Sequence, residues 1–117
     1  MNLVIASQGP DQTSSLGFQL DPPLVITGGL TPPVATSLVL QSGNNTIAVP
    51  SGAVGVFIIP PLGQAIVLLF KTSTTDTGVN IRQGTPSLFL FDTSNLPANI
   101  IINAASTATG WTQVLFF

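Results

Sequence analysis

Short apolar runs separated by turn-forming residues recur along the chain from residue 34 onward. The separators supply glycine, which adopts positive φ, or proline, whose φ is fixed. Many short strands spaced roughly 8–12 residues apart are typical of sandwiches and jelly rolls, and no window shows the apolar spacing of an amphipathic helix. The sequence therefore predicts an all-β fold, an antiparallel β-sandwich or jelly roll of about eight strands, within residues 34–41, 45–49, 53–59, 64–72, 79–82, 87–91, 99–103 and 111–117.

Residues 1–33 have a different pattern, in which prolines and glycines replace the regular apolar runs. A residue that precedes proline is held in an extended conformation. We therefore expect residues 1–33 to form an extended Pro-rich N-terminal arm, with a short strand at 24–27, that lies across a neighbouring subunit. Residues 34–117 form the predicted β-sandwich domain. An ordinary surface loop with one edge strand is the alternative to the arm.

Several predicted strands are apolar on both faces. Because side chains alternate between the faces of a strand, Leu88 and Leu90 point to one side, and Phe89 and Phe91 to the other. The core of a small sandwich covers only one of these sides. We expect an oligomer or a partner surface to cover the second side; burial of some strands under loops and the arm is the alternative.

The last predicted strand ends in two aromatic residues, Phe116 and Phe117, which alternate to opposite faces. We expect the intramolecular core to take one of them and a neighbouring subunit to take the other. The arm adds a short apolar patch and two pairs of prolines. The expected interface residues are Leu3, Val4, Ile5, Pro22, Pro23, Phe89, Phe91, Phe116 and Phe117.

Charged residues make up only 5% of the chain, far below the share in an ordinary soluble domain. Uncharged polar side chains replace them, and a neutral hydroxyl or amide costs less to bury than an ion. With a net charge of −2, and Lys71 and Arg82 as the two cations, the chain cannot neutralise a run of phosphates. The composition predicts contact between protein surfaces and no binding of nucleic acid.

A charge-free stretch at residues 53–70 approaches the length of a membrane-spanning helix. Pro60-Pro61 and Gly63 interrupt it, and consecutive prolines disrupt a helix. Two strands joined by a turn explain the same residues. We therefore expect no membrane association, and the first ten residues lack the basic segment of a secretory signal.

Few residues of the chain could carry out catalysis, since it has no His and no Cys. Asp76-Thr77-Gly78 matches the motif of aspartic proteases, which keeps a retropepsin-like aspartic protease as a remote alternative. The motif follows polar residues, and Asp-x-Gly is also suited to a tight turn. Asp21, Asp76 and Asp92 could each offer one oxygen to Ca²⁺, but they are scattered along the sequence. We expect no enzyme activity, catalytic residue, cofactor or metal site.

The whole pattern resembles small bacteriophage virion proteins of the capsid decoration or cement type: eight short strands, a Pro-rich leading arm, few charges and the closing residues Val114-Leu115-Phe116-Phe117. The resemblance implies a homo-oligomer, typically a trimer, made in the host cytoplasm and placed on the outer capsid surface. There it stabilises contacts between subunits of the major capsid protein. The alternative is a receptor-binding or fibre-tip β domain that binds host saccharide through Trp111 and polar loops, although we expect Trp111 to be buried in the core or an interface.

Overall fold

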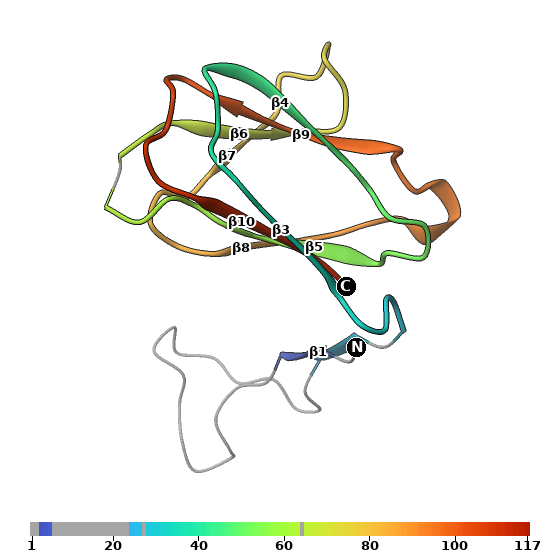
Figure 1. Ribbon diagram of the computed structural model, residues 1–117. Coiled ribbons are helices and arrows are strands. Elements are labelled where there is room, and N and C mark those ends of the chain that lie inside the picture. Colours follow the sequence, from blue (N-terminus) through green and yellow to red (C-terminus); the bar gives the residue numbers. More distant parts are fainter. Residues whose placement is uncertain (1–2, 6–23, 27, 64) are drawn as a thin grey trace.

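The computed structural model describes residues 3–5, 24–26, 28–63 and 65–117. Within these residues, eight strands form two four-stranded antiparallel sheets that pack face to face (Figure 1). This arrangement confirms the all-β sandwich, and each of its strands overlaps one of the predicted apolar runs. The strands are β3 (Val34–Leu38), β4 (Gly43–Ala48), β5 (Gly55–Ile59), β6 (Leu68–Lys71), β7 (Val79–Ile81), β8 (Ser87–Leu90), β9 (Asn99–Ala104) and β10 (Thr112–Phe116).

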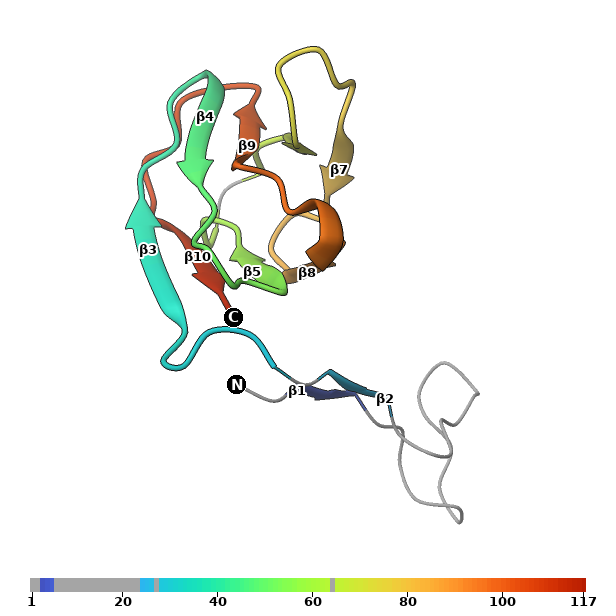
Figure 2. The same ribbon diagram turned by 90° about the vertical axis from the view of Figure 1, so that its right-hand side faces the viewer.

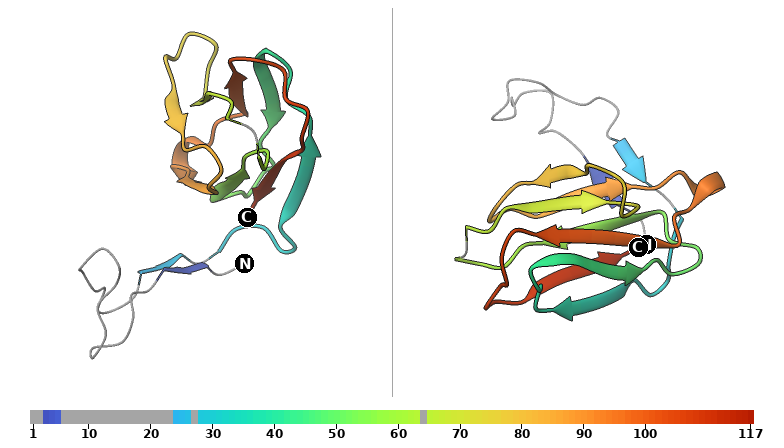
Figure 3. Two further views of the ribbon diagram at one scale, coloured as in Figure 1. Left: turned by 90° about the vertical axis from the view of Figure 1, so that its left-hand side faces the viewer. Right: turned by 90° about the horizontal axis from the view of Figure 1, so that it is seen from above.

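The two sheets have the strand orders β3-β10-β5-β8 and β4-β9-β6-β7, and we name them the β10 sheet and the β9 sheet. The chain pairs like a long hairpin folded over on itself, because β3 pairs with β10, β4 with β9, β5 with β8 and β6 with β7. Figure 2 shows the β10 sheet below the β9 sheet, and the strands of both layers run in similar directions (Figure 3). This nested connectivity is that of an eight-stranded jelly roll.

The charge-free stretch at residues 53–70 forms strands, as predicted. β5 ends at Ile59, Pro60 and Pro61 follow, and β6 begins at Leu68. Because proline has no backbone N–H group to donate a hydrogen bond, Pro60 and Pro61 cannot continue the strand pairing of β5. In the described part of the chain, no helix is both long and apolar enough to cross a membrane.

The core lies between the two sheets. Ile100 and Ile102 of β9 and Val114 and Phe116 of β10 point into it, and each is at most 1% exposed. Burial of each such side chain contributes about 1.5–3 kcal/mol to folding. Thr112 is also fully buried, and its Oγ1 has no hydrogen-bond partner among the described residues.

Part of the predicted arm is also described. β1 (Leu3–Ile5) and β2 (Leu24–Ile26) form a two-stranded antiparallel sheet, in which Leu3 is opposite Ile26. β2 confirms the short strand expected at residues 24–27. Pro22 and Pro23 lie outside the described residues, and the interface role expected for these prolines and for β1 stays a prediction.

Candidate interaction surface

The outer face of the β10 sheet is apolar across all four of its strands. Leu115 of β10 is opposite Ala35 of β3 on one side and Phe57 of β5 on the other, and Phe57 is opposite Leu88 of β8. In β5 and β10 the outward residues alternate with buried residues such as Val56 and Val114, and the strand register places Ala35 and Leu88 on the same outward side. We name this surface the apolar face; it consists of Ala35, Ser37, Phe57, Ile59, Leu88, Leu90, Gln113 and Leu115.

No charged residue occurs in these four strands. Ser37 and Gln113 are the polar residues of the apolar face, and both are uncharged. The exposed apolar residues include Leu90, which is 52% exposed. A partner that packs on this surface would therefore remove apolar side chains from water without desolvating an ion.

Phe116 and Phe117 point to opposite sides of the β10 sheet, as expected, but the chain itself buries both of them. Phe116 is 1% and Phe117 0% exposed. The Phe117 ring packs beside Phe57, with 5.5 Å between the ring centroids, and lies over Gly55. This corrects the expectation that a neighbouring subunit must cover one of the two, because a glycine leaves room for the second ring on the outer side.

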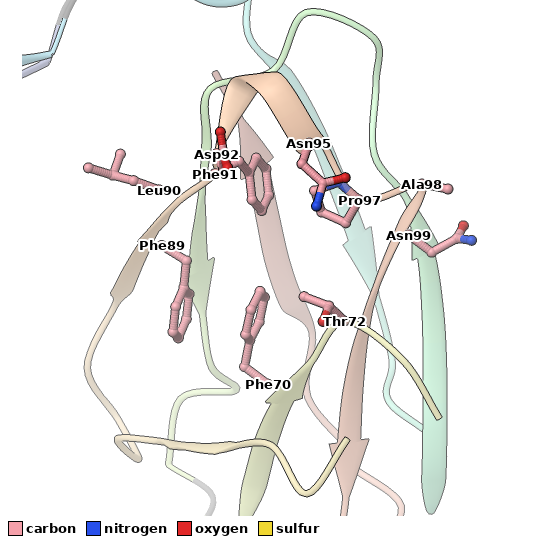
Figure 4. A pocket seen from close by; sticks show the side chains of 10 residues that line it. All are labelled: Phe70, Thr72, Phe89, Leu90, Phe91, Asp92, Asn95, Pro97, Ala98 and Asn99. Carbon is pink, nitrogen blue, oxygen red and sulfur yellow. The ribbon is translucent and has the colours of Figure 1, made fainter. Parts of the chain in front are cut away.

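The side chains of β8 alternate as expected, but the structure corrects which of them face outward. Phe89 is opposite the buried Val56, and both Phe89 and Phe91 pack against the core. Phe89 also stacks on Phe70 of the β9 sheet, with ring centroids 4.0 Å apart. The side chain of Leu90 points away from these rings (Figure 4). The register with β5 therefore makes the leucines, and not the phenylalanines, the outward residues of this strand.

Trp111 is 63% exposed, so the core does not bury it. It immediately precedes β10, the strand that carries Gln113 and Leu115 of the apolar face. The expected burial of Trp111 in an interface stays a prediction.

The outer face of the β9 sheet is polar by comparison. Asn103 of β9 donates a hydrogen bond to Asn44 of β4 over 2.7 Å. Ile101 lies on the same face, opposite Thr46 and Lys71, yet it is only 4% exposed. The chain itself therefore buries Ile101, although this residue faces outward.

Asp76 holds a turn together. Its Oδ1 accepts a hydrogen bond from the amide of Gly78 at 3.0 Å, and its Oδ2 accepts one from the amide of Thr72 at 3.3 Å. These bonds, first that from Gly78 and then that from Thr72, lower the pKa of Asp76. Gly78 has a φ of +83°, and a Cβ there would lie 2.9 Å from the carbonyl oxygen of Phe70. These contacts support the interpretation of the Asp-Thr-Gly motif as a turn.

A cavity of about 460 Å³ opens between the sheets, where β6 and β8 end (Figure 4). Its walls include the stacked rings of Phe70 and Phe89, and its rim includes Thr72, Asp92 and Asn95. Asp92 begins a short 3-10 helix, η1 (Thr93–Asn95), and its Oδ1 accepts hydrogen bonds from the amide and hydroxyl of Ser94. Four of the ten lining residues are polar, namely Thr72, Asp92, Asn95 and Asn99, a larger share than in the mostly apolar pockets that bind small ligands.

No group of three or more metal-ligating side chains occurs among the described residues. Asp76 and Asp92 each hold a separate turn, and Asp21 lies outside the described residues. No family model, curated protein or solved structure matches the chain.

Proposed function

We propose that the chain is a structural virion protein of the capsid decoration or cement type, which stabilises contacts between major capsid subunits. The observation that carries the proposal is the apolar face, an uncharged sheet surface on a compact domain. Packing of this surface against another protein would remove its apolar side chains from water. The jelly-roll connectivity agrees with the proposal by analogy, since viral capsid proteins use this architecture among others.

The placement of charge supports an outer position on the particle. Lys71 lies in β6 and Arg82 follows β7, so both cations belong to the β9 sheet or its loops. They form no basic stripe of the kind that proteins use to neutralise a nucleic-acid backbone. A subunit on the outer surface has no need of such a stripe.

The test is the composition of purified particles of the virus that encodes the chain. Quantitative mass spectrometry should find the chain at a copy number comparable to that of the major capsid protein, and a cryo-EM map should show its sandwich on the outer surface. Absence of the chain from the purified particles would overturn the proposal.

A receptor-binding or fibre-tip domain is the second candidate, and two observations favour it. Trp111 is exposed and offers an aromatic surface to a sugar ring. The cavity places Asn95 and Thr72 beside aromatic walls, and amides and hydroxyls are suited to sugar hydroxyls. Jelly rolls also occur in lectins.

A glycan array separates the two candidates. Binding that is lost in Trp111→Ala or Asn95→Ala, but kept in the control Val79→Ala, would support the fibre domain. So would a copy number far below that of the major capsid protein. An array without bound glycan, combined with capsid-like copy numbers, would eliminate it.

A further inference from the structure

We propose that the apolar face binds the same face of a second copy of this chain, so that two sandwiches pack sheet on sheet about a twofold axis. The inference rests on the proposed function, because it names a partner for the surface that carries that function.

Charge is the first argument. A twofold interface places each residue near the same residue of the other copy, so a charged residue near the axis would meet its own charge. The strands β3, β10, β5 and β8 contain no Asp, Glu, Lys or Arg. Apolar residues and the neutral Ser37 and Gln113 can therefore lie against their copies without like-charge repulsion. A partner with a charged docking surface would find no opposite charge here.

The number of apolar sheet faces is the second argument. In the described part of the chain, the β10 sheet has an apolar outer face, whereas the β9 sheet presents Asn44, Asn103 and Lys71. One such face per chain is satisfied once two copies meet, and the assembly then closes. The trimer implied by the family resemblance would instead require two different contact surfaces on each chain.

The exposed apolar residues on and beside the apolar face are suited to packing against a second sheet. Sheets that pack face to face lie about 10 Å apart, and side chains from both faces fill the space between them. Leu90 on the edge strand β8 is 52% exposed, and Trp111 beside β10 is 63% exposed. Leu115 and Phe57 lie between these positions, so the surface has apolar residues at its centre as well as at its border.

The size of the apolar face is the third argument, because it limits how strongly two copies can bind each other. Four strands at a spacing of about 4.8 Å, each four or five residues long, span roughly 15–20 Å in each direction. One such face is smaller than the roughly 800 Å² per partner of a typical stable interface. We therefore expect a weak, reversible dimer and not a permanent one.

The test is sedimentation velocity of the full chain and of three single variants from about 1 to 300 µM. Leu90→Lys and Trp111→Lys introduce a charge at exposed positions on or beside the apolar face, so neither should disturb the fold. Val79→Lys is the matched control, because Val79 is an apolar residue, 61% exposed, on β7 of the other sheet. Circular dichroism establishes that each variant keeps its β structure.

The wild type and Val79→Lys should pass from monomer to dimer with the same dissociation constant. Leu90→Lys and Trp111→Lys should raise that constant at least tenfold. A wild type that stays monomeric throughout the range, or a control that weakens the dimer as much as Leu90→Lys does, would overturn the inference.

Binding to purified particles stripped of the chain separates this inference from the proposed function. If the wild type is monomeric in solution but binds the particles, and Leu90→Lys does not bind, the apolar face takes the shell protein. The inference then falls while the proposed function stands. If the wild type dimerises as expected but is absent from native particles, the dimer stands and the proposed function falls.

Discussion

The ring of Phe117 occupies the space in which any other residue at position 55 would carry its Cβ atom. A Cβ built on Gly55 would lie 2.6 Å from Cζ of Phe117. The backbones of the two residues also bond to each other, since Phe117 N donates to Gly55 O at 3.1 Å and Gly55 N donates to Phe117 O at 3.3 Å. Gly55 does not have positive φ, so space and not backbone conformation requires a glycine there.

Gly55→Ala should lower the free energy of unfolding by about 1–3 kcal/mol, the usual cost of overpacking. The added methyl group meets the Phe117 ring and also the carbonyl oxygen of Phe89, which would lie 2.8 Å from it, so the ring and the β8 backbone must both shift. Chemical denaturation of the wild type and the variant measures the loss. The control is the same substitution in a Phe117→Ala background, where the ring is gone and the cost should shrink. An equal cost in both backgrounds would show that the ring does not cause it.

Asp76→Asn should leave the fold and the assembly intact, with a small loss of thermal stability at pH 7. The carboxylate accepts from two backbone amides, and an asparagine side chain keeps one acceptor oxygen. A cleavage activity present in the wild type and abolished in this variant would overturn the turn interpretation.

The same site predicts how stability depends on pH. Because hydrogen bonds from Gly78 and Thr72 lower the pKa of Asp76, its contribution is present above the unfolded-state pKa of about 4. It is lost as the pH falls through the lower pKa of the folded state. The difference in melting temperature between the wild type and Asp76→Asn should therefore shrink from pH 6 towards pH 2. A constant difference would contradict this mechanism.

Thr112→Val should raise the free energy of unfolding by about 1 kcal/mol, because it removes a buried hydroxyl that has no partner among the described residues. The valine has nearly the same shape and suits a strand. Thr46→Val, at an exposed site on β4, is the control and should change stability by less than about 0.5 kcal/mol. A destabilised Thr112→Val protein would mean that the hydroxyl is hydrogen-bonded in solution.

Self-association should be nearly insensitive to salt. The apolar face has no charge, and salt screens ionic interactions but not the burial of apolar surface. Sedimentation velocity at 50 mM and 500 mM NaCl should give similar dissociation constants. A dimer that dissociates at the higher concentration would point to an ionic interface elsewhere on the molecule.

The strands of the domain could be predicted from the sequence because each turn needs residues with particular backbone conformations. Gly52, Gly63 and Gly84 adopt positive φ between the strands, and these glycines are visible in the sequence. The order of the strands could not be predicted, because the pairing of β3 with β10 joins opposite ends of the domain. No local pattern records that contact.

The sequence predicts two-sided apolar strands, but not which residues form the outer face of the β10 sheet. The sequence shows that residues 87–91 are apolar on both sides. Which of these sides faces the core depends on the pairing of Phe89 with Val56. The burial of Phe117 depends on Gly55 and Gly29, which both lie close to it. A Cβ atom added at Gly29 would lie 2.7 Å from the Phe117 carbonyl carbon. Glycines leave no hydrophobic signal, so a space made by their missing side chains cannot be found from apolar patterning.

The central place of β10 sets the order in which this protein can be made. β10 lies between β3 and β5, so on the ribosome both strands wait for residues 112–116 before they can pair with it. Pairing between such distant segments is slow to form, and incompletely folded chains with unpaired strands tend to aggregate. The lack of charge on the β10 sheet allows two folded copies to pack together through their apolar faces. The same lack of charge leaves the nascent chain prone to non-native contacts until β10 has emerged.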